Sequence, residues 1–98
     1  MNIGQGKAGV SGAELLFNIA DAYEVSGRFE ETVDYYLKVP AQHPDQVVWV
    51  VKAYLRVAKI FEDRKDWEGA AVTYQKIIQL KTEESKYAQE RLDWIKKR

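Results

Sequence analysis

The feature that most constrains the fold of this 98-residue chain is an internal repeat. Residues 20–36 read ADAYEVSGRFEETVDYY, and 38 positions later residues 58–74 read AKIFEDRKDWEGAAVTY. The aromatic positions of the two copies coincide in three pairs: Tyr23 with Phe61, Phe29 with Trp67, and Tyr36 with Tyr74. An internal repeat predicts the architecture before any single residue is interpreted, because similar units of this length stack on one another.

The composition excludes several classes of protein. Fifteen basic and fifteen acidic side chains cancel, so the chain lacks the basic excess typical of a nucleic-acid binder. No run of about 18 apolar residues is present, so we expect no membrane insertion. Cysteine is absent and His43 is the single histidine, which leaves no thiolate nucleophile and no cysteine-rich or histidine-rich metal set. We therefore expect a protein that is not an enzyme and needs no cofactor.

Helical periodicity begins at Ser11. A capping box at Ser11 predicts the start of a first helix, apolar residues then recur at helical spacing, and Gly27 predicts its end. A second helix is expected to stop near Val39, because Pro40 lacks a backbone N–H and restricts the residue before it. Residues 40–44 are therefore expected to be a connector.

Three further helices follow in the same pattern. The third is expected to run from Asp45, and residues 63–66 are expected to turn the chain into a fourth helix at Trp67. Thr82 can cap a fifth helix. Five helices, short loops and no strand candidate predict an all-α chain.

Two helix pairs with these spacings resemble tetratricopeptide (TPR) repeats. That family's pattern has an aromatic, Leu-Gly and Tyr on the first helix, followed by Ala, an aromatic and Pro. The first copy supplies Leu16, Ile19-Ala20, Tyr23, Thr32, Tyr36 and Pro44. The second copy supplies Tyr54, Val57-Ala58, Phe61, Ala70 and Tyr74, with Thr82 in the place of Pro. The chain departs from the pattern at Thr32, which replaces a small Ala, and at Pro40.

The period of 38 is longer than the usual 34 by about one helical turn, which fits a first helix lengthened through DQVVWVV. Such spacing resembles bacterial extracytoplasmic repeat proteins of the Tol-associated and outer-membrane-assembly type. The resemblance implies a short right-handed α-solenoid. Its expected parts are a flexible tail over 1–10, repeat 1 over 11–44, repeat 2 over 45–81 and a capping helix over 82–98.

The resemblance also implies a protein-interaction scaffold whose partner lies in a concave groove lined by the first helices. We expect the partner contacts to come from eight residues: Phe17, Asn18, Asp21, Trp49, Lys52, Leu55, Arg56 and Lys59. The first helix is acidic there and the third is basic, so these charges either pair across the groove or meet an acidic peptide. Trp49 is either an exposed interaction anchor or packs against the first helix pair.

Two more specific hypotheses remain open. Some TPR domains bind the C-terminal carboxylate of chaperone tails with a two-carboxylate clamp, and Asn18, Lys52 and Arg56 match three of its positions. The other Lys and Asn of that clamp belong to a preceding repeat that is not visible in this sequence. Alternatively, the chain is an assembly unit that forms a homodimer or joins a longer array, because two repeats fall short of the usual three. The compartment is left open.

Overall fold

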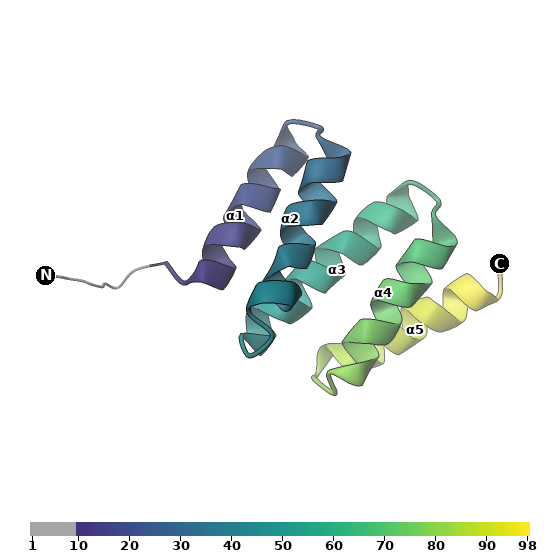
Figure 1. The fold of residues 1–98 in the computed structure, drawn as a ribbon. Coiled ribbons are helices and arrows are strands. Elements are labelled where there is room, and N and C mark those ends of the chain that lie inside the picture. The colour runs from purple at the N-terminus through teal and green to yellow at the C-terminus, as the bar shows by residue number, and fades with distance from the viewer. Residues whose placement is uncertain (1–9) are drawn as a thin grey trace, which may run out of the picture.

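The computed structural model describes residues 10–98 as a row of helices without strands in that range (Figure 1). The helices are α1 (Gly12–Val25), α2 (Phe29–Gln42), α3 (Val47–Asp63), α4 (Trp67–Gln79) and α5 (Glu84–Lys96). The all-α fold is confirmed. The expected flexible tail lies outside the described residues, apart from Val10, which is exposed. In the described residues, no helix combines the length and apolarity needed to cross a membrane.

The turns that follow α1 and α3 have the same geometry. Gly27 has φ +76°, and its counterpart 38 positions later, Lys65, has φ +62°. In each turn two N–H groups bond back to the end of the helix: those of Gly27 and Arg28 in the first, and those of Lys65 and Asp66 in the second. The repeat therefore extends to the backbone, although only the first turn has the glycine that this conformation favours.

The prediction that α2 stops near Val39 is wrong. The helix continues to Gln42 with Pro40 inside it. Proline removes one hydrogen bond, but the N–H of His43 still reaches the carbonyl of Val39 at 2.8 Å and closes the last turn. Val39 is fully buried, so core packing holds this turn in place. The connector is correspondingly shorter, and α3 begins at Val47 instead of the expected Asp45.

Thr82 does not cap α5. The helix begins at Glu84, and no side chain caps it at Glu83, whose backbone is already helical. The bond found there has the opposite sense, because the Oγ of Ser85 accepts from the backbone N–H of Thr82 at 3.1 Å. The Thr82 hydroxyl is buried and has no partner among the described residues.

The core consists of two clusters that meet at α3. The first contains Ala13, Ala20, Tyr36, Val39, Val50, Ala53 and Val57. The second contains Ala58, Ala70, Tyr74, Ile77, Ala88, Leu92 and Ile95. Alanines stand where helices approach closely, and tyrosines fill the space between them. Helix α3 is thus shared: Val50, Ala53 and Val57 face the α1–α2 pair, while Ala58 faces α4 and α5.

Exchanging the residues of the two matched turns should change stability in opposite directions. Lys65→Gly is expected to stabilise the fold by up to about 1 kcal/mol, because a left-handed backbone costs a non-glycine residue about 1–2 kcal/mol and the extra freedom of unfolded glycine offsets part of that gain. Gly27→Lys should destabilise by a similar amount, since a Cβ there meets no atom within 4 Å and the cost is conformational. Urea denaturation measures both, and equal stability of the two variants would contradict the argument.

Candidate functional site

Each helix pair contains a tyrosine on its second helix that donates a hydrogen bond to a carboxylate on its first helix. The Tyr36 hydroxyl on α2 donates to Glu24 on α1 at 3.0 Å and also to Asp21. The Tyr74 hydroxyl on α4 donates to Glu62 on α3 at 2.5 Å. Because the two tyrosines and the two glutamates are repeat counterparts, the structure contains the same bond twice.

An arginine from the next helix completes each of these networks. Arg56 of α3 donates to Glu24 and lies 3.9 Å from Asp21. Arg91 of α5 donates to Glu62, with its Nε 3.1 Å from the carboxylate. Each network therefore joins a helix pair to the helix that follows it. It follows that α5 holds the same position relative to the α3–α4 pair as α3 holds relative to the α1–α2 pair.

The second network fixes the protonation states of its members. Burial raises the pKa of Tyr74 well above its ordinary value, and the hydrogen bond to Glu62 raises it further. Burial also acts to raise the pKa of Glu62, but the hydrogen bonds from Arg91 and Tyr74 outweigh it, so the pKa of Glu62 lies below its ordinary value. At neutral pH the network therefore contains a neutral phenol, a carboxylate and a guanidinium.

A groove lies between α3 and α5. It consists of two adjoining depressions of about 500 and 470 Å³ that share Leu55, and we call it the α3–α5 groove. Helix α3 contributes Val47, Val48, Val51, Lys52, Leu55, Arg56, Lys59 and Glu62. The other wall is formed by Tyr74, Lys81, Thr82, Glu83, Glu84, Tyr87 and Arg91. Both walls carry cations, and aliphatic and aromatic side chains lie among them.

The structure divides the eight predicted contact residues between two places. Four of them line the α3–α5 groove: Lys52, Leu55, Arg56 and Lys59. The other four lie on α1 or at the α1–α3 contact: Phe17, Asn18, Asp21 and Trp49. Charges do pair between α1 and α3 at Arg56, as one of the two open interpretations expected. Whether these residues bind a partner stays a prediction.

Trp49 packs against the first helix pair and is not an isolated exposed anchor. Its ring centroid lies 5.4 Å from that of Phe17, which in turn is 5.1 Å from the ring of Tyr36. The ammonium group of Lys52 lies 4.6 Å from the centre of the Trp49 ring. Trp49 therefore belongs to the first core cluster and contacts Lys52, which lines the groove.

The contribution of α5 to the groove was not predicted. The fifth helix was expected to be a cap, yet its residues Tyr87 and Arg91 line the groove, and Tyr87 is 51% exposed. The signal was present in the sequence, since Arg91 follows Arg56 by 35 positions. That interval is three shorter than the repeat period, so a comparison at 38 positions does not align the two arginines.

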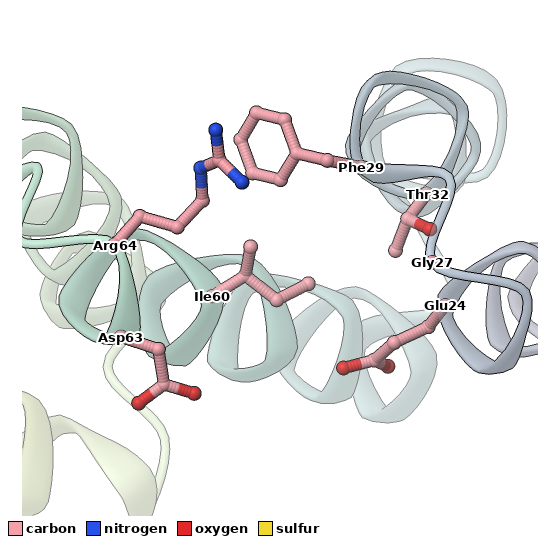
Figure 2. Close-up of a pocket in the computed structure, with 7 residues that line it drawn as sticks. All are labelled: Glu24, Gly27, Phe29, Thr32, Ile60, Asp63 and Arg64. Carbon is pink, nitrogen blue, oxygen red and sulfur yellow. The ribbon is translucent and has the colours of Figure 1, made fainter.

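A smaller cavity, of about 220 Å³, lies where the α1–α2 turn meets the end of α3 (Figure 2). The guanidinium carbon of Arg64 lies 3.7 Å from the centre of the Phe29 ring, and Ile60 lies beside them. Glu24 also lines this cavity, but its carboxylate is already bonded to Arg56 and a tyrosine. The α3–α5 groove is therefore the stronger candidate site. No group of three or more potential metal ligands is found within residues 10–98.

The family follows from comparison with known proteins. A family model described as tetratricopeptide repeat matches residues 14–45 and 52–80, which together are more than half of the chain. The chain therefore belongs to the tetratricopeptide repeat family, as the sequence pattern indicated. Comparison with curated proteins and with solved structures gave no match. Tetratricopeptide repeats form a non-catalytic scaffold that generally mediates protein–protein interaction, and the Tol-associated subtype stays a prediction.

Replacing Glu62 with Gln should make the free energy of unfolding less dependent on pH in the acidic range. Since the folded chain holds the pKa of Glu62 below its ordinary value of about 4.3, the unfolded chain takes up the proton first on acidification. The free energy of unfolding of the wild type therefore falls as the pH drops from about 5 through the lowered pKa of Glu62. The uncharged variant lacks this contribution at neutral pH, so its free energy of unfolding should fall less on acidification.

Urea denaturation at several pH values between about 7 and 3 measures the difference. Glu90→Gln, at an exposed position of α5, is the matched control and should keep the wild-type slope. Parallel profiles for the wild type and Glu62→Gln would contradict the role assigned to this carboxylate.

Proposed function

We propose that this chain binds a protein partner in the α3–α5 groove, and that the bound segment is acidic with an apolar side chain between its carboxylates. The observation that supports this is the convergence of cations from two helices on an apolar floor. The cations are Lys52, Arg56, Lys59 and Arg91 on these helices and Lys81 just before α5, and the apolar lining includes Leu55 and Tyr87. Three acids, Glu62, Glu83 and Glu84, also line the groove, so its cations outnumber its acids by two although the net charge of the chain is zero.

Four of these cations differ in how freely they can meet a ligand. Arg56 and Arg91 are bonded to carboxylates of the preceding helix pair, which fixes their positions. Lys59 pairs with Asp63 at 3.4 Å, but both side chains are largely exposed and such a pair contributes only about 0.3–0.5 kcal/mol. Lys52 lies over an aromatic ring at the groove edge. The two lysines can therefore turn to an incoming carboxylate at little cost.

Apolar surface in the groove supplies the rest of the binding energy in this proposal. Val48 is 67% exposed and Tyr87 is 51% exposed, so both have area for a partner to cover. Burial of apolar surface contributes about 25 cal/mol per Å². Tyrosine and arginine are both enriched at interaction hot spots, and Tyr87 lies one turn from Arg91 on α5.

The spacing of the lysines indicates the spacing of the ligand. Lys52 and Lys59 are seven residues apart on α3, which corresponds to two turns and about 10.5 Å along the helix. An extended peptide covers that distance in about three residues. Leu55 lies between the lysines, so the preferred ligand has two acidic residues about three positions apart with an apolar residue between them.

The two-carboxylate clamp suggested by the family resemblance is not part of this proposal. Arg56, one of its three matching positions, is already paired with Glu24 and Asp21. A carboxylate that approached Arg56 would have to displace these acids or bind beside them.

Selection from a random peptide library, with the wild-type chain as bait, tests the proposal. Enriched peptides should carry acidic residues around an apolar one, and Lys52→Glu/Lys59→Glu should weaken their binding at least about tenfold, because two attractions become repulsions. Lys76→Glu/Lys86→Glu changes two exposed lysines that do not line the groove and is the control with the same charge change. Equal loss in both double variants, or enrichment of uncharged peptides, would contradict the proposal.

A further inference from the structure

The outer face of α1 has no charged residue. It consists of Leu15, Ile19, Ala22 and Ser26, which recur at alternating steps of four and three along the helix. Leu15 is 54% exposed, and Ala22 and Ser26 are exposed as well, whereas Gly12 at the start of the helix faces the ring of His43. The acidic residues of α1 all lie elsewhere on the helix. In a chain of which 31% is charged, such an exposed stripe calls for an explanation.

The repeat identifies what this stripe corresponds to. Its first three members precede by 38 positions the residues Ala53, Val57 and Ile60 of α3. Those α3 residues form the face that packs against the α1–α2 pair. Helix α1 therefore offers the same kind of packing face as α3, at the end of the row of helices, and no described element covers it (Figure 1).

The opposite end of the row differs. On α3, Tyr54, Ala58 and Phe61 face α4. Their counterparts on α5, 35 positions later, are Gln89, Asp93 and Lys96, and all three are exposed. The outer face of α5 thus exposes polar and charged side chains, which water solvates well. The outer face of α1 exposes uncharged, largely apolar side chains. Stacking of α1 of one copy on α5 of another would bury charges without partners, so an end-to-end array is disfavoured.

We propose that the outer face of α1 binds the same face of a second copy of this chain, which gives a two-fold dimer. A two-fold contact places identical residues opposite one another, so a charged face repels itself and an uncharged face does not. The small residues Ala22 and Ser26 permit close approach of the helices, and Leu15 and Ile19 supply apolar area. Alternating steps of three and four are also the spacing of a seam between paired helices.

This dimer is independent of the proposed groove function. The α3–α5 groove lies on helices that the contact does not use, so each copy keeps its groove open. A dimer would present two grooves to a partner that carries two binding segments, which raises the effective affinity without new contacts.

Sedimentation equilibrium over about 5 to 500 µM tests the proposal. The wild type should change from the mass of one chain to that of two as the concentration rises. Leu15→Glu should stay a monomer with unchanged helical circular dichroism. Gln89→Glu adds the same charge to the outer face of α5 and should dimerise like the wild type. A wild type that is monomeric throughout, or a Leu15→Glu variant that dimerises equally well, would overturn the proposal.

Cysteine cross-linking tests the geometry, because the chain has no cysteine of its own. Ile19 lies at the middle of the stripe, so Ile19→Cys should form a disulfide-linked dimer under mild oxidation. Gln89→Cys should remain a monomer under the same conditions. Preferential cross-linking between the two variants in a mixture would indicate end-to-end stacking and overturn the two-fold arrangement.

Discussion

The structure depends most on a carboxylate that is nearly removed from water. The side chain of Glu62 is 15% exposed and that of its partner Arg91 is 29% exposed. Removing one partner of a buried ion pair costs about 3–5 kcal/mol, and this pair, which keeps some exposure, belongs near the lower end of that range. The carboxylate is therefore stable only if Tyr74 and Arg91 are both in place. This requirement fixes α5 against the α3–α4 pair more specifically than apolar packing alone would.

The same requirement shapes the candidate site. Arginines that join successive helix pairs also form part of the groove wall, so the residues that stabilise the stack are the ones that make its surface basic. The acids they neutralise are Glu24 and Glu62, while Lys52 and Lys59 have no role in the stack. The groove lining therefore contains five cations and three acids, and of these acids Glu62 is held in an internal pair with Arg91.

Most of the fold could be predicted from the sequence because it depends on local patterns. Helical periodicity and the glycine at position 27 are visible within a few turns of the chain, and the repeat of aromatic residues is visible when two segments 38 positions apart are compared. Pro40 was mispredicted because tertiary packing decided its role: the buried Val39 holds the helix closed around the proline. Thr82 was mispredicted because a local bond of the opposite sense forms instead, in which the Oγ of Ser85 accepts from the Thr82 N–H.

Only the α3 side of the site was predicted, because the interval between the matching residues of α3 and α5 differs from the repeat period. The α3 side of the groove follows from the repeat, whereas Tyr87 and Arg91 are found only after the interval of 35 positions is recognised. The pairing of Arg56 with Glu24 joins residues 32 positions apart. No periodicity within a single helix indicates such a pair, since it depends on how one helix pair is placed against the next.

The position that holds these arginines also accounts for the difference between the two ends. Asn18 on α1 stands where Arg56 stands on α3 and Arg91 on α5, at intervals of 38 and 35 residues. The two arginines each meet a glutamate of the preceding pair. In the described structure no helix pair precedes α1, so an arginine at position 18 would lack such a glutamate. The amide of Asn18 carries no charge, so within the described residues this side of α1 holds no unpaired cation.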